Sequence, residues 1–569
     1  MTPERTAIFQ RWKSETDFDQ ETRAELELLI SEGNAQELED RFYKDIEFGT
    51  GGIRALMGAG TNRLNRYTVA RTTEGLARYL LDTFGAEACA QRGTVIAYDT
   101  RVHSAEFANV TASVLSGMGI QVRLFDAPRP TPQLSFAVRH FGSLAGVVIT
   151  ASHNPKEYNG YKVYDENGCQ LVPKQAKAVS AYIAGVDGYE AVRLSADQTL
   201  IEKIDVTDAF VCAVLKQSRL CSSTAKRALK AVYTPLHGTG QEPVLEALRR
   251  DGFTGVQPVE NQSDTDGRFP TVRTPNPEDP QALIMAVEQA TSMDADLVLA
   301  TDPDCDRVGI AVRSGKQFKT LTGNQTGALL TDFVLANTQL EAMANPVVLK
   351  TIVTSDLGAD IARKYGLMVL STLTGFKYIG EKIARFGQER EHARRTFVLG
   401  YEESYGYLVG NHVLDKDGVV ASMLICEAAA YWKAQGMTLV DRLDVLHKEF
   451  GFYLDAQDGF TFKGQGGHEQ MQRFMNALRS GEIPFGGVKQ TIDYRQPQKL
   501  EDGVELLPSS NVLKFMLEGG SWVAIRPSGT EPKLKVYYSI HGTTAQQTEE
   551  VLGYLRSSIK NAIDFEGEA

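Results

Sequence analysis

The chain has 569 residues and a formal net charge of −12, from 60 basic and 72 acidic side chains. Its hydrophobic content of 42% and charged content of 23% are typical of globular proteins, and its length predicts about three to five domains. The acidic balance argues against a nucleic-acid partner, which needs a basic surface. Any anion-binding site must therefore be local and built from a few Lys and Arg side chains.

The six cysteines indicate reduced thiols in a cytoplasmic protein, because no two of them form a CxxC pair. The first residues contain no apolar segment of the kind found in a secretory signal. The longest nearly apolar run, 419–432, is too short to span a bilayer and contains Glu427. It predicts a buried helix that begins after Asp417 and Gly418, and we expect no membrane partner.

In chain order, residues 1–40 combine helical spacing of apolar residues with many charges, which predicts two surface helices. A Gly-rich loop, 48–54, follows and ends in Arg54. From there, short apolar runs typical of buried parallel strands alternate with amphipathic stretches, which predicts an α/β fold. These runs are 94–98, 146–149, 231–233, 295–300, 346–349 and 396–399.

Three apolar runs lead into polar loops, at 150–155, 302–307 and 400–406. Ligands of open α/β sheets lie at the carboxyl ends of strands, so these three loops are expected to meet in one cleft. A strand–loop–strand pattern over 521–540 predicts a smaller C-terminal α+β domain. The predicted domains are 1–208 (N-terminal helices and a first α/β domain), 209–322, 323–440 and 441–569.

Asp302, Asp304 and Asp306 place three carboxylates at alternate positions, which require a hard cation to offset their repulsion. An EF-hand loop also begins D-x-D-x-D, but Arg307 stands where that loop needs Gly, and Arg313 where it needs Glu. Magnesium, with a position open for a phosphate oxygen, fits better. The alternative is a solvated acidic turn, which the preceding buried strand and Arg307 disfavour.

Ser152 follows an apolar run and precedes His153, an arrangement that suits a nucleophile. The sequence is not the Gly-x-Ser-x-Gly elbow of hydrolases, so phosphoryl transfer beside a divalent cation is favoured over acyl transfer. The alternative is a turn or helix-cap serine before Asn154 and Pro155. Lys162 either supplies a cation to this site or is an ordinary strand lysine.

The loop that begins at Arg526 predicts a phosphate cradle, with a bidentate guanidinium, two hydroxyls and a glycine. A plain turn between two strands is the alternative. No Walker A motif occurs, so a P-loop nucleotide site is not indicated. The cradle residues are Arg526, Ser528, Gly529 and Thr530.

Three further positions carry weaker signals. Glu402, Glu403 and Ser404 follow a strand and suit two vicinal sugar hydroxyls, although a surface loop is the better interpretation in isolation. Lys377 follows a Gly-containing turn and could move a proton if nearby cations lower its pKa, but a lone Lys is normally solvated. Arg54, after two glycines, suits an anion.

Taken together and in this order, these motifs resemble the α-D-phosphohexomutase superfamily, in particular its phosphoglucomutase branch. The resemblance extends from about residue 42 to about residue 545. It is carried by 150–155 with 159–162, 302–307, 400–406 and 526–530, and supported by 49–54, 234–238 and 271–277. It implies a four-domain, heart-shaped protein, in which three similar α/β domains with mixed sheets and a smaller C-terminal α+β domain surround a central cleft.

The resemblance also implies roles for the site residues. Ser152 matches the serine that carries the phosphoryl group, and the three aspartates match the ligands of one Mg²⁺ per chain, with a phosphoserine oxygen as a further ligand. Glu402 and Ser404 match residues that bind sugar hydroxyls, and the Arg526 loop matches the one that binds the non-reacting phosphate. Lys377 matches the general acid or base. The polar groups around the phosphoserine are matched by Arg54, His153, Lys162 and Arg307.

One position departs from the family pattern, because Pro303 replaces the usual Gly of the metal loop. The three carboxylates remain, and Pro restricts φ without removing a ligand. This form resembles a sub-branch with phosphopentomutase-like and hexose-bisphosphate-synthesising members. The predicted activity is that of a phosphoglucomutase, working through phosphoserine and glucose 1,6-bisphosphate. Phosphopentomutase, phosphomannomutase and glucose 1,6-bisphosphate synthase activities are the alternatives, and we expect a monomer or small homo-oligomer with a phosphosugar substrate.

Overall fold

The computed structural model describes residues 1–14, 18–189, 192, 195–390, 394–462, 466–482, 486–503, 506–527 and 533–568. The chain forms two compact units. Unit 1 comprises residues 1–321, 376–390 and 406–433, and unit 2 comprises 322–375, 391–405 and 434–569. Two segments of the predicted 323–440 domain, 376–390 and 406–433, thus group with unit 1. The other predicted domain limits stay predictions.

Three helices, not two, precede the first sheet: α1 (Pro3–Ser14), α2 (Gln20–Ser31) and α3 (Ala35–Phe42). The predicted number was wrong because Gly33, in the left-handed region at φ 68°, ends α2, and the Asn34 side chain then caps α3 by accepting from Glu37 N at 3.2 Å. The helices also bury an aromatic cluster that includes Trp12 and Phe18, whose rings stack with centroids 4.5 Å apart.

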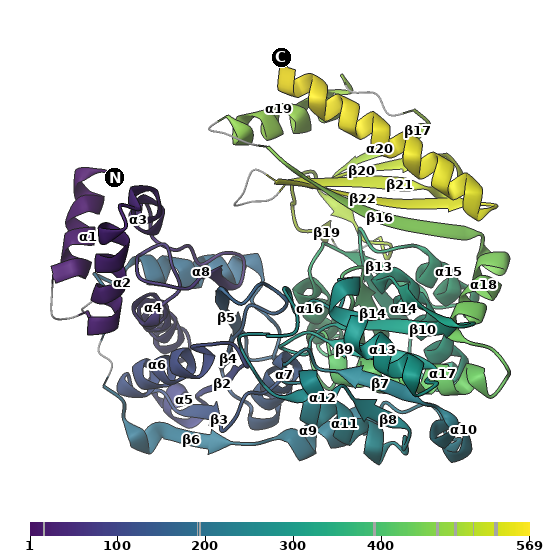
Figure 1. The fold of residues 1–569 in the computed structure, drawn as a ribbon, viewed down its shortest axis with the longest axis horizontal. Coiled ribbons are helices and arrows are strands. Elements are labelled where there is room, and N and C mark those ends of the chain that lie inside the picture. Colours follow the sequence, from purple (N-terminus) through teal and green to yellow (C-terminus); the bar gives the residue numbers. More distant parts are fainter. Residues whose placement is uncertain are drawn as a thin grey trace. The chain divides into compact units, whose positions relative to one another are not determined.

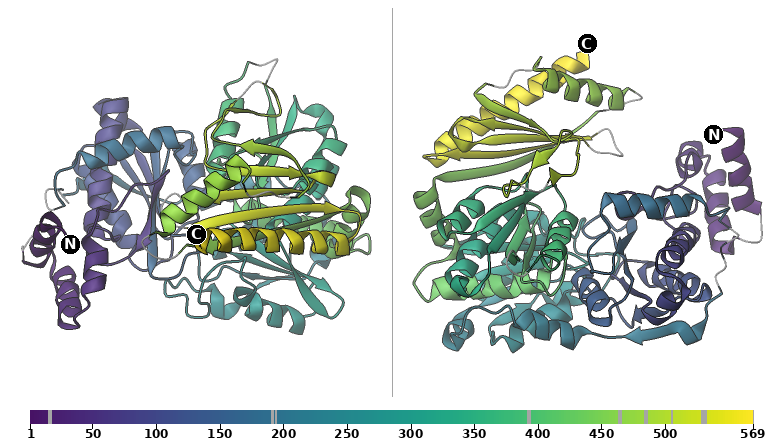
Figure 2. Two further views of the ribbon diagram at one scale, coloured as in Figure 1. Left: turned by 90° about the horizontal axis from the view of Figure 1, so that it is seen from above. Right: turned by 180° about the vertical axis from the view of Figure 1, so that it is seen from behind.

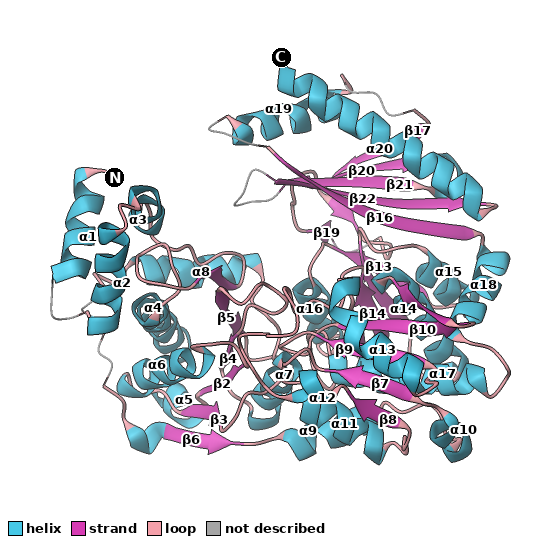
Figure 3. Cartoon of the chain, in the orientation of Figure 1, coloured by secondary structure: helices cyan, strands magenta, loops and turns pink. Residues whose placement is uncertain are grey.

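The first domain of unit 1 is built on a six-stranded mixed sheet in the order β1-β5-β4-β2-β3-β6 (Figures 1 and 3). β2, β3, β4 and β6 are parallel, whereas β5 runs antiparallel to both β4 and β1. The strands are Gly52–Leu56, Thr94–Tyr98, Val122–Phe125, Ala145–Ile149, Tyr158–Tyr164 and Ile201–Ile204, for β1 to β6. The helices are α4 (Arg66–Phe84), α5 (Ala86–Gln91), α6 (Ser104–Gly117), α7 (Thr131–Phe141) and α8 (Pro173–Ala184).

The second domain of unit 1 has a five-stranded mixed sheet in the order β11-β10-β9-β7-β8. The strands are Ala231–Thr234, Val256–Pro258, Leu297–Thr301, Val308–Ser314 and Gln317–Leu321, for β7 to β11. Its helices are α9 (Thr207–Leu215), α10 (Ser223–Ala228), α11 (Gln241–Arg250), α12 (Glu260–Ser263) and α13 (Ile284–Ser292). β9 is buried at every residue and delivers the three aspartates at its carboxyl end.

Two later segments complete unit 1: α16 (Phe376–Phe386), and β15 (Gly406–Val409) with α17 (Gly418–Lys433). The buried helix predicted after Asp417 and Gly418 is confirmed as α17, which packs against α10 and α11. The Asp417 carboxylate accepts hydrogen bonds from Val419 N at 2.8 Å and Val420 N at 3.2 Å, and so satisfies two of the free donors at the start of the helix.

Unit 2 begins with a parallel sheet in the order β13-β12-β14, formed by Met368–Thr372, Pro346–Thr351 and Thr396–Glu402. Its helices are α14 (Gly323–Ala336), α15 (Leu357–Lys364) and α18 (Leu439–Phe450). Tyr401 of β14 packs so closely on α14 and α15 that a Cβ at Gly327 or Gly358 would lie 2.2 Å from its ring or hydroxyl. These glycines let both helices approach the strand that carries Glu402.

The C-terminal part of unit 2 is an antiparallel sheet in the order β16-β22-β21-β20-β17. The strands are Phe452–Thr461, Lys533–Gly542, Trp522–Pro527, Leu513–Leu517 and Val488–Asp493, in that spatial order. A short pair, β18 (Gln498–Lys499) and β19 (Leu506–Leu507), follows β17. Helices α19 (Gly467–Ser480) and α20 (Ala545–Glu568) cover one face (Figures 1 and 2). The α/β organisation with a C-terminal α+β domain is confirmed.

The two faces of this sheet differ, because side chains alternate along each strand. Val523 and Ile525 belong to the apolar core beneath α19 and α20. Trp522, Ala524 and Arg526 therefore point to the opposite face.

Among the described residues, no helix is long and apolar enough to cross a membrane.

Candidate active site

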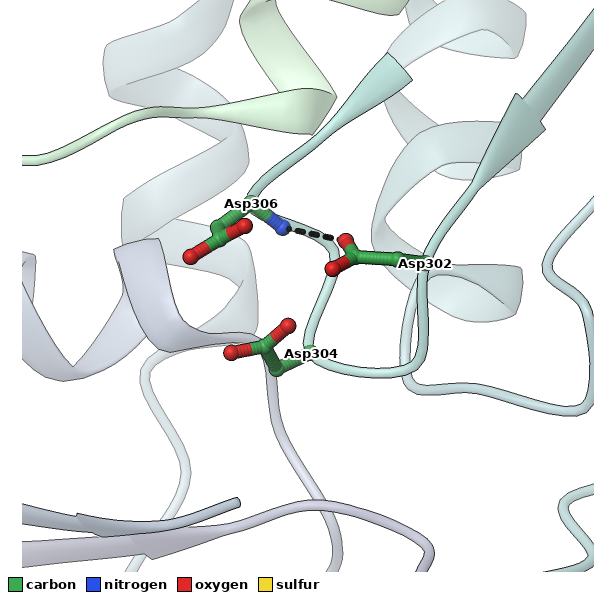
Figure 4. A group of neighbouring side chains, drawn as sticks. All are labelled: Asp302, Asp304 and Asp306. Carbon is green, nitrogen blue, oxygen red and sulfur yellow. Dashed lines mark hydrogen bonds between the residues drawn. The ribbon is translucent and has the colours of Figure 1, made fainter. Parts of the chain in front are cut away.

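The three aspartates form a buried cluster on the loop between β9 and β10 (Figure 4). Asp302 and Asp304 are fully buried and Asp306 is 2% exposed. One carboxylate oxygen of each lies within 4.8 Å of the others. Asp302 Oδ1 accepts from Asp306 N at 3.1 Å and Arg307 N at 3.0 Å, which closes the loop and turns the three carboxylates toward one point.

Two other segments of unit 1 hold this loop. Thr239 donates to the Pro303 carbonyl from its backbone N at 2.8 Å and its Oγ1 at 2.9 Å. Gly238 lies so close that a Cβ would be 2.4 Å from Pro303 Cα. Thr131, the first residue of α7, donates to the Asp304 carbonyl at 2.9 Å and to Asp304 Oδ2 at 3.0 Å. The loop conformation is thus fixed from both domains of unit 1.

Ser152 lies directly beside the carboxylates, in the loop after β4. Its Oγ donates to Asp302 Oδ2 at 2.6 Å and is 3.1 Å from His153 Nδ1. Its backbone is in the left-handed region at φ 52°, which is uncommon for a residue with a side chain and frequent at functional sites. Two of the three predicted strand-end loops therefore meet within unit 1.

A buried ion pair, Asp99 and Arg101 after β2, holds the Ser152 loop. The Arg101 guanidinium donates to four backbone carbonyls of the segment 152–158, at 2.5 to 2.9 Å. Asp99 Oδ2 accepts from Thr150 Oγ1 at 2.7 Å and lies 3.3 Å from Arg101 Nε. Because these groups are buried and hydrogen-bonded, they keep the strained loop in one conformation.

Two lysines approach the carboxylates from different elements. Lys162 of β5 lies 3.0 Å from Asp304 Oδ2 and 3.6 Å from Asp306 Oδ2, and Lys416, before α17, lies 3.1 Å from Asp306 Oδ2. Burial, together with repulsion by Asp304 and Asp306, raises the pKa of Asp302 well above its usual value. Burial alone would raise the pKa of Asp304 as well, but the charges of Lys162 and Lys416, together with hydrogen bonds from Asp302 and Lys162, outweigh burial and hold that pKa below its ordinary value.

These residues fit a divalent cation. Asp304 Oδ1 and Asp306 Oδ1 are buried and accept no hydrogen bond from the described residues, although buried carboxylate oxygens normally have partners. The donor set consists of hard oxygens with three acidic groups in one place, which is the chemistry that Mg²⁺ prefers. Ser152 Oγ could add a fourth oxygen, because it already contacts Asp302.

The other candidate residues of unit 1 surround this centre. Arg54 of β1 donates to Asn154 Oδ1 at 3.1 Å, and Arg307 forms an ion pair with Glu278. Burial, with the charges of Arg307 and Arg54, lowers the pKa of His153 well below its usual value, so its imidazole is neutral at pH 7. Lys377, in the first turn of α16, donates to the Thr50 carbonyl of the Gly-rich loop.

The remaining candidates belong to unit 2, where Tyr537 of β22 is the common neighbour of Glu402 and Arg526. Burial, with the charge of Glu403, raises the pKa of Tyr537, and a hydrogen bond with Arg526 opposes this rise. The charge of Glu402, at the end of β14, acts on Tyr537 in the same direction as Glu403. The charges of Glu402 and Arg526, from two of the predicted substrate-binding segments, therefore both act on one side chain of this unit.

Glu403 and Ser404 follow Glu402 in the turn after β14. Glu403 Oε2 accepts from Thr351 Oγ1 at 3.2 Å and Thr354 Oγ1 at 3.3 Å, and Ser404 is half-buried. Ser528, Gly529 and Thr530 lie outside the described residues.

Several residues around these sites were not identified from the sequence. Arg101 and Thr131 act through backbone and side-chain contacts to loops 50 or more residues away, which spacing along the chain does not reveal. Lys416 lies between two aspartates, just before the predicted helix, at a position that was not identified from the sequence. Tyr537 belongs to a strand of alternating side chains. The alternation predicts which side chains share a face of the sheet, but it does not predict which other residues lie on that face.

Comparison with known families gives matches along most of the chain. The family described as "Phosphoglucomutase/phosphomannomutase, alpha/beta/alpha domain I" matches residues 45–190. The families described in the same way as domain II and domain III match residues 208–315 and 322–450. Residues 488–555 match the C-terminal domain of the same group.

Similar proteins extend over almost the full length. A phosphoglucomutase of Staphylococcus haemolyticus is 37% identical, over 91% of this chain and 94% of its own. A "Probable phosphoribomutase" of Schizosaccharomyces pombe is 34% identical, over 96% and 94%. Among solved structures, parafusin, a phosphoglucomutase from Paramecium, has a TM-score of 0.68 at 16% identity, over 92% and 96% of the two chains. A phosphoglucomutase/phosphomannomutase family protein of Burkholderia thailandensis has 0.67 at 19%, over 90% and 97%. At these identities the structural matches show the fold.

Proposed function

The chain belongs to the phosphoglucomutase/phosphomannomutase family, and on this premise we propose that it interconverts α-D-glucose 1-phosphate and glucose 6-phosphate. The staphylococcal relatives at 36–37% identity that bear the name phosphoglucomutase favour glucose as the sugar. The reaction would use a phosphoryl group carried by Ser152 and glucose 1,6-bisphosphate as the intermediate.

One observation carries the proposal. The Ser152 hydroxyl lies 2.6 Å from Asp302 Oδ2, within a buried carboxylate cluster in which two oxygens have no hydrogen-bond partner among the described residues. A serine in that position is next to the proposed cation, and cations near the reacting phosphoryl group offset the charge on its oxygens. A hydrolase serine would instead need a base and an oxyanion hole arranged for a carbonyl.

Asp302, Asp304 and Asp306 would hold one Mg²⁺, with Ser152 Oγ or a phosphoserine oxygen as a further ligand. When bound, the ion offsets the charge of the phosphoryl oxygens as the bond to Ser152 Oγ breaks or forms. Lys162, Arg54 and Arg307 add positive charge around the same group.

The proposed cycle begins with the phosphoryl group on Ser152. The O6 hydroxyl of glucose 1-phosphate attacks the phosphorus, the bond to Ser152 Oγ breaks, and a base takes the O6 proton. The product, glucose 1,6-bisphosphate, turns around and returns its 1-phosphoryl group to Ser152, so that glucose 6-phosphate leaves. Lys377 is our candidate for the proton transfer; the neutral His153, 3.1 Å from Ser152 Oγ, is the second.

Residues of unit 2 would bind the part of the substrate that does not react. Glu402 and Ser404 would bind two sugar hydroxyls, and Arg526 with Ser528, Gly529 and Thr530 would bind the other phosphate. The closeness of Glu402 and Arg526 to Tyr537 supports one sugar phosphate contacting both segments.

The test is the conversion of glucose 1-phosphate to glucose 6-phosphate with Mg²⁺, with and without a trace of glucose 1,6-bisphosphate, beside mannose 1-phosphate and ribose 1-phosphate. Turnover of the glucose substrate that the bisphosphate stimulates is the expected result. No turnover of any of the three sugars, or free bisphosphate as the main product, would contradict it.

A pentose phosphate is the second candidate substrate, because the fission-yeast relative named "Probable phosphoribomutase" matches 96% of this chain. The ribose 1-phosphate arm of the same assay decides between the two sugars. We also propose a cytoplasmic monomer or small homo-oligomer; all six cysteines are free thiols, as a reducing compartment requires.

A further inference from the structure

Unit 2 contains a cavity of about 430 Å³ that none of the proposed substrate-binding residues lines. Its walls come from β12 and the loop after it, from α15 and β13, and from the strands β17 and β20, with the short pair β18–β19 beside them. Four of its lining residues are basic: Lys350, Arg363, Lys499 and Lys514. Two are acidic: Asp356 and Glu501.

Lys514 of β20 is the unusual member of this group. It is 7% exposed, its Nζ donates to the Ile352 carbonyl at 2.7 Å, and it lies over the Trp522 ring at 3.9 Å. Among the described residues, no carboxylate lies within ion-pair distance of it. A buried ammonium group without a counter-ion is unfavourable, so such a group either loses its proton or takes an anion as a partner.

Four of the other charged groups around the cavity already have partners. Lys350 forms an ion pair with Asp356 at 2.8 Å, and Arg363 forms one with Asp360 at 2.7 Å. Glu501 accepts hydrogen bonds from Ser371 N and Ser371 Oγ, at 2.9 and 2.6 Å. Among the described residues, Lys514 is therefore the buried cation of the lining that has no carboxylate within ion-pair distance, and Lys499 adds a second, exposed positive charge.

We propose that this cavity is a second anion-binding site, in which Lys514, assisted by Lys499, binds inorganic phosphate. The anion would supply a counter-ion that the described residues do not provide. The site differs from the proposed substrate phosphate loop, because Arg526 does not line the cavity. The proposal concerns binding alone and does not depend on the reaction proposed above.

When no anion is bound, the Lys514 amine should be partly deprotonated. Burial and the charge of Lys350 lower the pKa of Lys514 to about 7, against the weaker opposing charges of Asp356 and Glu501. Tyr494, the remaining titratable group of the lining, has a raised pKa because of burial and stays neutral near pH 7. An anion would raise the pKa of Lys514, so binding should take up a proton above pH 7.

The position of the cavity suggests a consequence for the substrate site. Ile352, which accepts the Lys514 hydrogen bond, lies between Thr351 and Thr354, and these two threonines hold the Glu403 carboxylate next to Glu402. An anion on Lys514 would therefore act on the loop that supports Glu403.

We would measure sulfate binding by calorimetry between pH 6 and 9, because sulfate stays a dianion over this range and the pH dependence then belongs to the protein. The measurement is made on the full chain with Arg526→Ala, to weaken the substrate phosphate loop. We expect affinity to be constant below pH 7 and to fall by about tenfold per pH unit above it. Inorganic phosphate should compete with sulfate.

Three variants make the test specific. Lys514→Met should abolish this class of binding, and Lys489→Met, an exposed lysine of β17, should leave it unchanged. Lys514→Arg should bind sulfate without the pH dependence, because guanidinium does not titrate in this range. This variant keeps the test decisive if the Met variant does not fold.

A crystal soaked in selenate, which replaces sulfate and has an anomalous signal, should show a peak beside Lys514. The proposal is overturned if sulfate binding is the same in wild type and Lys514→Met, or if binding is pH-independent in both wild type and Lys514→Arg. Selenate found at the Arg526 loop and absent beside Lys514 would overturn it as well.

Discussion

Lys162 in unit 1 and Lys514 in unit 2 are both largely buried amines, but the protein surrounds them differently. Lys162 lies 3.0 and 3.6 Å from two carboxylate oxygens of the aspartate cluster, whereas Lys514 faces a backbone carbonyl and an aromatic ring. A buried ion pair needs its partners in place. The centre in unit 1 thus brings its own opposite charges together, whereas Lys514 would take its opposite charge from the anion that we propose binds there.

This difference predicts which property a substitution in each unit should change. Changes in unit 1 should affect the chemical step and metal binding, because its charges are proposed to act on the reacting phosphoryl group. Changes in unit 2 should mainly affect KM, because its residues are proposed to bind the non-reacting part of the sugar phosphate. The following variants test this division, in order of decreasing effect.

Ser152→Ala should have the largest effect. Loss of the phosphoryl-carrying oxygen should lower kcat by about four orders of magnitude or more, as removal of the nucleophile does in other enzymes. The measurement is the mutase assay, with intact-mass analysis for the phosphoprotein. Ser113→Ala, on the exposed side of α6, is the control. Phosphorylation that persists in the Ser152 variant would remove this residue from its proposed role.

Asp304→Asn should have the second-largest effect. The neutral amide keeps the size of the side chain but removes one of three charges that offset the cation, so we expect weaker Mg²⁺ binding and a rate about 10²- to 10³-fold lower. Calorimetry with Mg²⁺ and the mutase assay measure the two effects. Asp294→Asn, at an exposed position of the same domain, should change neither. Unchanged metal affinity in Asp304→Asn would contradict the ligand assignment.

Arg101→Lys should have an intermediate effect, and it tests a positioning role. A lysine cannot reproduce the four hydrogen bonds that the guanidinium donates to the Ser152 loop, so the loop should lose its fixed conformation. We expect kcat to fall by about 10- to 100-fold with KM nearly unchanged.

The free energy of unfolding of Arg101→Lys should fall by about 1–3 kcal/mol. Arg123→Lys, at a half-buried arginine of β3 away from the site, is the matched control for packing. A loss of stability without a change in kcat would mean that Arg101 is only structural.

The sequence predicted the parts of this molecule that depend on local pattern. Buried runs such as 297–301 and 145–149 are hydrophobic because both faces of their sheets are covered, and the loops after them carry the polar residues. The helix beginning at Gly418 was also predictable, because its cap and apolar run are adjacent in the chain.

Contacts between distant segments could not be predicted in the same way. The hydrogen bonds of Arg101 to residues 152–158, and the position of Lys416 beside Asp306, depend on how strands are ordered in space. The third N-terminal helix was missed because a single Gly–Asn pair separates it from the second. The site residues themselves came from the order of four loops, since each signal alone had a plausible structural explanation.

Glu402→Gln tests the other side of the comparison, with the smallest expected effect. Gln keeps the shape of the side chain and replaces a charged acceptor by a neutral one, so a hydrogen bond to a sugar hydroxyl should weaken by about 1–2 kcal/mol. KM for glucose 1-phosphate should therefore rise by about 5- to 30-fold, with a smaller change in kcat and none in Mg²⁺ affinity. Glu449→Gln, an exposed residue of α18 in the same unit, should leave all three unchanged. If Glu402→Gln lowered kcat as strongly as Arg101→Lys and left KM unchanged, the two units would not divide binding from chemistry, and Glu402 would have to act on the reacting group itself.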